Sequence, residues 1–441
     1  MFTPLRVVIV IAVTFGFLFV IENNRSDAND YDTNIVNALR KEGYDVVVED
    51  LGEKTELPKQ IHIHQEPHVD LEMDPGKSTN VYHKTPKGKP WPSPMEMFGE
   101  TAVLKLVPLF GEIRPEKDAV FTFAKGVPFN NLVRFVGSLQ ETGFDGDIVM
   151  AVEQRHELDK DTLQYLEYHS KHSHLVVYQA ELVCKKIKMK TRCKVFKMFA
   201  HKTLGGYLPD LRPHRELAQL RFEYYWAWST QYSPKSRLFL LDSGDLMFQE
   251  NPFPYLPVNM EKTIVAFEES NLKNIGDESN NRLWLREGHE RKYLHSMGKN
   301  NVLCAGTVAG GQAAVETFCR AMVNQWDTTK CTIIGCDQGH FNFLVHGNFL
   351  VGSPGIEKVD VVPFDESFVI SLAIQVAYSH SLRHARIVQG GSNYVLNKKG
   401  KPAAIAHQFD KDPELKQIYD TKKTAPYLEA WAAIKKTLTA G

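Results

Sequence analysis

Two aspartates stand close together directly after a run of large apolar residues. They are Asp242 and Asp245, in the segment RLFLLDSGDLMFQENPF that runs from Arg237 to Phe253. The run Leu238 to Leu241 has the length and bulk of a strand buried on both faces of a parallel sheet. Ionised carboxylates are costly to remove from water, so a pair at the end of such a strand needs a counter-charge or a cation.

The chemistry that suits this pair is the binding of a hard divalent cation. Mg²⁺ and Mn²⁺ take carboxylate oxygens from the protein, and phosphate oxygens commonly complete their coordination shell. A nucleotide diphosphate is therefore a natural partner. The ion would neutralise the charge that develops on a departing diphosphate. Gly244, between the two acids, is expected to let the backbone turn sharply.

The elements that must position the pair are predicted from the alternation of strand-like and helical patterns. Strands are expected at Ala119 to Ala124, Asp147 to Val152, Leu175 to Ala180 and Thr263 to Ser270, and an aromatic helix at Glu216 to Tyr232. Such alternation indicates βαβ units, an α/β fold and a mostly parallel central sheet flanked by helices. Ligands of open sheets gather at the carboxyl ends of the strands, which is where Asp242 and Asp245 lie.

The acidic segment carries a family resemblance. LLDSGDLMFQENPF resembles the metal motif of GT-A fold glycosyltransferases, in which a strand ends in an Asp-x-Asp-like element followed by two apolar residues and Phe. It is similar to a plant and algal group of nucleotide-diphospho-sugar transferases with an Asp-x-Arg-Asp-x-x-Phe-Gln pattern. Asp245 matches the second acid of the common motif, whereas the first falls on Ser243 and Asp242 comes one residue early. Gly244 stands where the narrower group carries Arg, and these departures concern the number of metal ligands rather than the place of the site.

Two further segments acquire roles from this resemblance. It implies that Arg221, in the helix before the acidic strand, lies near the nucleotide diphosphate; a surface salt bridge is the alternative. VLCAGTVAGG, from Val302 to Gly311, resembles a segment that lies under the donor sugar and the acceptor. It is expected to be a strand that runs into a turn of small residues, where Gly306 and Gly310 would allow close backbone approach. Glycine at a plain turn is the other interpretation.

The carboxyl-terminal half supplies two more candidates. CDQGHFNFLVH resembles an Asp-Gln-x-x-x-Asn element, which implies that Asp337 is a catalytic base or accepts a sugar hydroxyl, while Asn342 supports the fold. An acid placed at a helix start for structural reasons is the competing interpretation of Asp337. IAHQFDK resembles a terminal segment whose histidine is a third metal ligand, here His407. A hydrogen-bonded core histidine is the alternative.

Composition bounds the class of protein. The chain has 441 residues, a net charge of −1 and 43% apolar residues, as expected of a globular enzyme with no sign of a nucleic-acid binder. Six cysteines are sparse on a chain of this length. They allow a few disulfides, with Cys331 and Cys336 as a plausible local pair, but buried free thiols remain the alternative.

The amino terminus predicts attachment to a membrane. Val7 to Ile21 is an uncharged apolar run behind Arg6, followed by no small-x-small cleavage site. We therefore expect a short cytosolic tail over residues 1–6, a transmembrane signal anchor over 7–21, a stalk over 22–100 and a catalytic domain over 101–441. Asn24 begins a glycosylation triplet on the side that would be lumenal. The stalk contains His62, His64 and His68, a candidate metal tract that is more simply an exposed loop or edge strand.

Together, these features predict a single-pass type II membrane protein of the Golgi or endoplasmic reticulum with a lumenal catalytic domain. The resemblance, which extends from about Ala119 to Asp410, implies a metal-dependent glycosyltransferase of the hexosyltransferase type. It would use Mn²⁺ or Mg²⁺ and transfer sugar from a nucleotide-diphospho-sugar to a glycan or glycoprotein. The alternatives are a non-catalytic GT-A-like protein that binds glycans or a partner, and a metal-dependent hydrolase built on the same acids and histidine.

Overall fold

The computed structural model describes residues 7–13, 17–23, 101–103, 106–187, 190–195, 199–201, 214–331, 333–379, 382, 387–388 and 394–440. The chain divides into two units, Met1–Thr79 and Asn80–Gly441. Asn24 and the histidine tract at 62–68 lie outside the described residues, as does nearly all of the predicted stalk.

The first unit differs from the prediction of a transmembrane helix over 7–21. Strand β1 (Val7–Val13) pairs antiparallel with β2 (Phe17–Asn23), and the pairing places Val7 opposite Asn23. The segment is rich in Val, Ile and Phe, which favour strands, and it is shorter than the roughly 20 residues that a spanning helix needs. Across the described ranges, no helix is both long and apolar enough to cross a bilayer.

The second unit is built on a seven-stranded sheet in the order β14-β12-β13-β10-β4-β5-β6. The strands are β4 (Ala119–Phe123), β5 (Asp147–Val152), β6 (Leu175–Gln179), β10 (Arg237–Leu241), β12 (Thr263–Glu268), β13 (Leu303–Gly311) and β14 (Lys358–Val362). All neighbouring strands are parallel except that β13 runs antiparallel to both β10 and β12. The prediction of an α/β fold with a mostly parallel sheet is confirmed.

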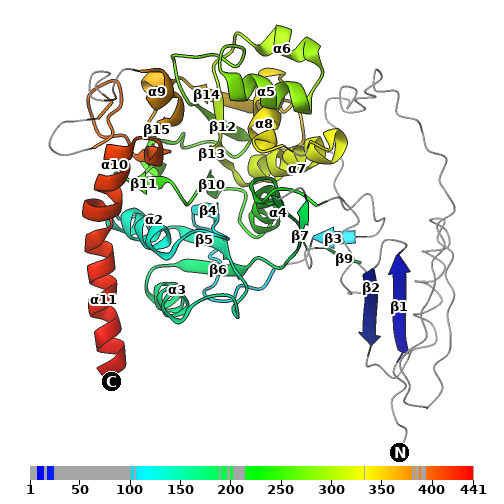
Figure 1. The fold of residues 1–441 in the computed structure, drawn as a ribbon, viewed down its shortest axis with the longest axis vertical. Helices are drawn as coiled ribbons and strands as arrows, with labels where there is room; N and C mark the ends of the chain where they lie inside the picture. Colours follow the sequence, from blue (N-terminus) through cyan, green and yellow to red (C-terminus); the bar gives the residue numbers. More distant parts are fainter. Residues whose placement is uncertain are drawn as a thin grey trace, which may run out of the picture. The chain divides into compact units, whose positions relative to one another are not determined.

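Helices cover both faces of this sheet (Figure 1). The helices described in this unit are α2 (Phe129–Glu141), α3 (Lys160–His172), α4 (Leu217–Ser229), α5 (Ser279–Gly288), α6 (Arg291–Met297), α7 (Gln312–Thr329), α8 (Cys336–His346), α9 (Ala373–Tyr378), α10 (Pro413–Ile418) and α11 (Ala425–Ala440). Leu238 and Leu240 of β10 pack into one core with α4, α7 and α8. Phe239 and Leu241 pack into a second core with α2, α3 and α11. The strand is apolar throughout because each of its faces meets a layer of helices.

Among the described residues of the second unit, three smaller sheets accompany the large one. The first has the order β11-β16-β15, from β11 (Leu246–Phe248), β16 (Ile405–His407) and β15 (Val369–Ser371). The others are the pair of β3 (Thr101–Val103) with β9 (Phe199–His201) and the hairpin of β7 (Leu182–Ile187) with β8 (Lys190–Val195). The residues between β10 and β11, Asp242 to Asp245, are here called the acidic turn. Because β11 directly follows the acidic turn, its pairing with β16 brings the carboxyl-terminal part of the chain back to that turn.

Candidate active site

The acidic turn and a histidine from the end of the chain form one cluster. Asp242 follows β10, Asp245 precedes β11, and His407 pairs with Leu246 at the start of β11. One ligand atom from each of the three residues lies within 4.8 Å of the others. His407 Nε2 is 3.6 Å from Asp242 Oδ2 and 3.5 Å from Asp245 Oδ1. The structure thus brings together the three side chains that the sequence proposed as metal ligands.

His407 turns one ring nitrogen toward the two carboxylates and the other toward a serine. It is fully buried, and its Nε2 has no hydrogen-bond partner. Its Nδ1 lies 3.1 Å from Ser371 Oγ and 3.5 Å from Cys304 Sγ. A proton on Nδ1 would be donated to Ser371, which leaves the Nε2 lone pair facing the two carboxylates. One imidazole nitrogen and two carboxylates are a donor set that fits a divalent cation such as Mn²⁺.

Arg221 of α4 joins the acidic turn to the start of α8. Its guanidinium donates to Asp242 Oδ1, to Asp337 Oδ2 at 2.8 Å and to the Ala305 carbonyl at 3.2 Å. The side chain is buried, so this is not the surface salt bridge considered from the sequence. A forked cation between two carboxylates reduces their mutual repulsion and fixes the distance between them.

The protonation of these groups is shifted in different directions. Burial opposes the ionisation of Asp242, but Arg221 and His407 outweigh it, so the pKa of Asp242 lies below its usual value. Burial dominates at Asp337 and raises its pKa despite the attraction of Arg221. Burial would lower the pKa of His407, yet the neighbouring thiol and the two carboxylates outweigh it and raise the pKa well above its usual value. A cation bound at Nε2 would compete with that proton.

A cavity of about 480 Å³ opens beside the cluster. Its walls come from the end of β4 and the loop after it, the start of α4, the acidic turn and the start of α8. The lining residues are Phe123, Lys125, Val127, Leu217, Ala218, Arg221, Asp242, Ser243, Gly244, Asp245, Asp337 and Asp410. The cavity therefore lies at the carboxyl ends of β4 and β10, where open sheets of this kind bind ligands.

The acidic turn is held from two sides. The Gly244 carbonyl accepts hydrogen bonds of 2.8 Å from both Asn131 and Arg134 of α2. The backbone N–H of Gln408 donates to the Asp245 carbonyl at 2.8 Å. The backbone bends at Gly244 as expected, but the bend does not use the conformational freedom of glycine: its φ is not positive, and a Cβ there would meet open space. Hydrogen bonds rather than glycine geometry shape the turn.

The two glycines proposed from the sequence have different surroundings. A Cβ on Gly306 would lie 2.3 Å from Asp242 Oδ2 and 3.1 Å from His407 Cε1, so only glycine leaves room for both side chains. Gly310 lies toward the other end of β13, opposite Leu238 at the start of β10. β13 also runs through Gly311 as a strand, and the predicted turn of small residues is not found. Gly310 is thus not brought to the cavity.

Some residues of the site escaped the sequence analysis. Glu269, directly after β12, is buried, and burial raises its pKa to about 7. Its carboxylate accepts a hydrogen bond of 3.4 Å from Gln408, the neighbour of His407. The signal was an acid at the carboxyl end of a predicted strand, the same signal that marked Asp242. Ser371, which supports His407, had no signal because serine is common at strand ends.

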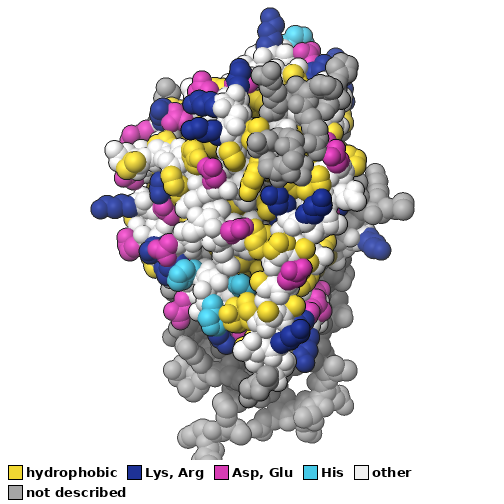
Figure 2. Space-filling view, turned by 90° about the vertical axis from the view of Figure 1, so that its left-hand side faces the viewer, with side chains coloured by type: hydrophobic (Ala, Val, Ile, Leu, Met, Phe, Trp, Pro, Cys, Tyr) yellow, Lys and Arg dark blue, Asp and Glu magenta, His cyan; other side chains and the backbone are white. Residues whose placement is uncertain are grey.

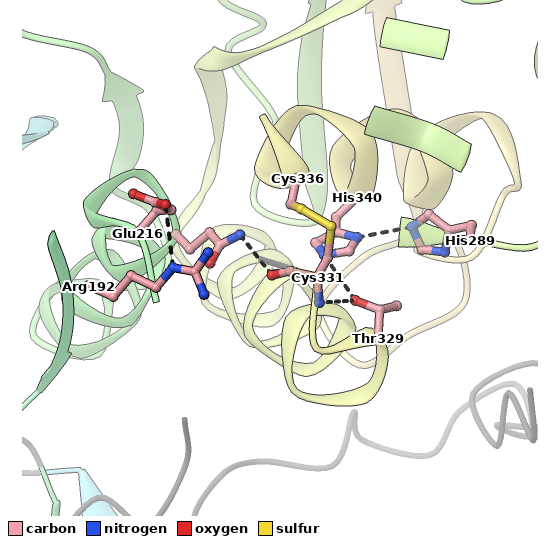
Figure 3. The surroundings of a disulfide bond; sticks show 8 residues. Arg192, Glu216, His289, Thr329, Cys331, Cys336 and His340 are labelled. Carbon is pink, nitrogen blue, oxygen red and sulfur yellow. Dashed lines mark hydrogen bonds and ion pairs between the residues drawn. A yellow bond between two sulfur atoms is a disulfide. The ribbon is translucent and has the colours of Figure 1, made fainter. Parts of the chain in front are cut away.

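Two disulfides stabilise the surroundings, Cys184–Cys193 and Cys331–Cys336. The predicted local pair of Cys331 and Cys336 is confirmed. Figure 3 shows this disulfide and its surroundings. Cys336 is the first residue of α8, and Asp337 follows it directly. Farther along the helix, Asn342 exchanges hydrogen bonds of 2.9 and 3.0 Å with the backbone of Leu303 in β13. Asp337 is therefore carried on a helix start that is fixed by a covalent bond and by the sheet.

The chain matches no known family model and no curated protein. Among solved structures, it is similar to the glycosyltransferase GlyE of Streptococcus pneumoniae TIGR4, with 12% identity, a TM-score of 0.40 and coverage of 73% of this chain and 64% of GlyE. It is also similar to the galactosyltransferase LgtC, with 11% identity, a TM-score of 0.37 and coverage of 71% and 95%. The glucosyl-3-phosphoglycerate synthase of Mycobacterium tuberculosis has 14% identity, a TM-score of 0.27 and coverage of 62% and 82%. The chain is thus similar to solved glycosyltransferases, but likeness at this level carries no argument about its activity, which rests on the geometry of the site.

Proposed function

We propose that this chain is a metal-dependent glycosyltransferase that moves a sugar from a nucleotide-diphospho-sugar to a hydroxyl of a glycan or glycoprotein. The observation that carries the proposal is the convergence of Asp242, Asp245 and His407 Nε2, which makes no hydrogen bond, beside a cavity. Arg221 and Asp337 line the same cavity.

The charge of the cavity explains why a metal belongs to the proposal. The acidic lining residues are Asp242, Asp245, Asp337 and Asp410, and the basic ones are Lys125 and Arg221. A diphosphate entering this space would meet more negative than positive charge, and the repulsion is strong where water is scarce. A divalent cation between the carboxylates and the diphosphate changes the sign of that interaction.

Helix starts add to the attraction of a diphosphate. Leu217 and Ala218, the first residues of α4, line the cavity, and no side chain caps this helix start. Asp337 lies in the first turn of α8, which also reaches the cavity. Free backbone N–H groups and the positive end of the helix dipole favour anions at such positions.

The residues of the chain divide the chemical work. Asp242, Asp245 and His407 would hold the cation, which supplies charge neutralisation for the leaving diphosphate. Arg221 binds and orients Asp337 while contributing positive charge at the same place. Asp337 is the group placed to accept a proton from the attacking sugar hydroxyl, and its raised pKa brings it closer to the pH at which such a base works best.

The cellular location is part of the proposal. The two disulfides favour an oxidising compartment such as the lumen of the secretory pathway. Attachment to the Golgi or endoplasmic reticulum membrane through the amino-terminal segment remains a prediction from the sequence. Protease protection of the chain in sealed microsomes, with and without detergent, would test it.

A panel of nucleotide-diphospho-sugars tests the activity. Purified full-length protein should release nucleoside diphosphate from one donor in the presence of Mn²⁺ and a matching acceptor, and not after chelation. Asp245→Asn should lose metal-dependent turnover, and intact turnover in this variant would show that the metal assignment is wrong. Turnover with water alone on a phosphate or glycoside substrate would favour a hydrolase. No binding of nucleotide by calorimetry would favour a non-catalytic protein.

A further inference from the structure

The hairpin formed by β7 (Leu182–Ile187) and β8 (Lys190–Val195), here called the basic hairpin, concentrates positive charge. Its two strands contain no acid and carry Lys185, Lys186, Lys190, Arg192 and Lys194. The chain as a whole has a net charge of −1, and the face seen in Figure 2 intersperses Lys and Arg with Asp and Glu. The basic hairpin therefore departs locally from the charge balance of the protein.

This concentration of charge opposes the stability of the hairpin. Lys185 lies directly opposite Arg192 across the strand pair, and like charges at such positions are destabilising. Two-stranded hairpins are also marginally stable by themselves. The disulfide Cys184–Cys193 links the adjacent cross-strand pair and holds the strands together against the repulsion. Charge repulsion that lowers stability and is offset by a disulfide is typical of a surface with a function.

The basic hairpin is fixed next to the start of α4. Cys193 exchanges two backbone hydrogen bonds of 2.8 Å with Arg215. Arg192 Nε lies 3.6 Å from a carboxylate oxygen of Glu216, as Figure 3 shows. The next residue along the chain, Leu217, lines the cavity. A ligand that extends out of the cavity past the start of α4 would therefore reach the basic hairpin.

Two of the lysines are available to such a ligand. Lys185 and Lys186 are exposed, and within the described ranges neither has a carboxylate partner. No described residue of the basic hairpin lines the cavity itself. Because the proposed function puts the donor diphosphate inside the cavity, the lysines would meet the other substrate.

We propose that the basic hairpin binds acidic groups of the acceptor, which is then a saccharide that carries carboxylates or sulfates. The role as acceptor site rests on the proposed function, whereas the binding of an acidic saccharide does not. Repeated anionic groups along an extended sugar chain complement repeated cations along a hairpin. The cavity beside it has the opposite charge, so an acidic chain would be held at the basic hairpin and repelled from the metal ligands.

Calorimetry on the full chain tests the proposal. The probes are a sulfated and a carboxylated oligosaccharide, a neutral oligosaccharide of the same length, a single-stranded oligonucleotide, and vesicles containing phosphatidylserine. The test variant is Lys185→Gln/Lys186→Gln. The charge-matched control is Lys171→Gln/Lys292→Gln, whose lysines are exposed on α3 and α6. Lys185→Arg/Lys186→Arg keeps the charge and should keep binding.

The test variant should bind the acidic oligosaccharide about tenfold more weakly than wild type, since each exposed ion pair contributes modestly. Its affinity should also depend less steeply on salt, because fewer counterions are released. The control variant should bind as wild type does, and the affinity of every variant for a nucleoside diphosphate with Mn²⁺ should stay unchanged.

Three results would overturn the proposal: no preference for acidic over neutral oligosaccharide, equal losses in the test and control variants, or a dependence on Lys185 and Lys186 only for vesicles or the oligonucleotide. Failure of the proposed function looks different. In that case nucleoside diphosphate does not bind, while binding of the acidic oligosaccharide still depends on the two lysines.

Discussion

Arg221 of α4 and Asp337 of α8 are joined by an ion pair of 2.8 Å, although 116 positions separate them in the sequence. The same guanidinium donates to Asp242. One buried cation thus connects a candidate metal ligand to the candidate base, and any change in its charge or shape acts on both.

Replacing Arg221 should therefore damage both stability and turnover. Arg221→Gln leaves the buried carboxylate of Asp337 and the half-buried carboxylate of Asp242 without their shared cation, a loss of about 3–5 kcal/mol in the free energy of unfolding. It should lower kcat/KM roughly 10²–10³-fold, as the loss of one preorganised donor does. Arg221→Lys keeps the positive charge but loses the forked guanidinium. Its stability and its kcat/KM should lie between those of wild type and Arg221→Gln. Turnover equal to wild type in a folded Arg221→Gln protein would contradict the assigned role.

Gly306 offers a test of packing at the site with a matched control. Gly306→Ala places a Cβ 2.3 Å from Asp242 Oδ2, so Asp242 or β13 must move. Gly244→Ala adds the same methyl group to the acidic turn, where a Cβ meets open space. We expect Mn²⁺ affinity to fall at least about tenfold for the first, as for other changes that disturb ligand orientation, and to be unchanged for the second. Equal affinities for both variants would show that Gly306 does not position the ligands.

Glu269 predicts how the stability of the metal-free protein changes with pH. Its pKa is raised by burial from 4.5 to about 7, so the folded state favours the protonated form. That contribution is fully present below pH 4.5 and is lost as pH rises through 7, with a total of about 3 kcal/mol. Glu269→Gln should remove this part of the pH dependence in chemical denaturation. An unchanged profile between pH 4.5 and 8 would mean that Glu269 titrates normally.

The central sheet could be predicted from the sequence because burial on both faces leaves continuous apolar runs. Leu238 to Leu241 face helices on each side, and such a run admits few other interpretations. The segment Val7 to Val13 is just as apolar and was predicted to be part of a transmembrane helix, but it forms a strand. At that length, the pattern of apolar residues does not distinguish a short helix from a strand.

The candidate site could be predicted only in part. Asp242 and Asp245 could be predicted because carboxylates directly after a buried strand require a counter-charge or a cation. His407 was linked to them by family resemblance alone. Their meeting depends on the pairing of β11 with β16, and no local pattern specifies that long-range register. The basic hairpin was missed since the balanced charge of the whole chain conceals a local excess.

Binding of Mn²⁺ to His407 is the most direct test of the account. Pulsed electron paramagnetic resonance on wild-type protein with Mn²⁺ should show coupling of the ion to a histidine nitrogen. The coupling should disappear in His407→Gln and persist in His340→Gln, where the buried histidine lies instead 3.0 Å from His289. Nitrogen coupling that survives in His407→Gln, or its absence from the wild-type protein with saturating Mn²⁺, would contradict a metal held by Asp242, Asp245 and His407.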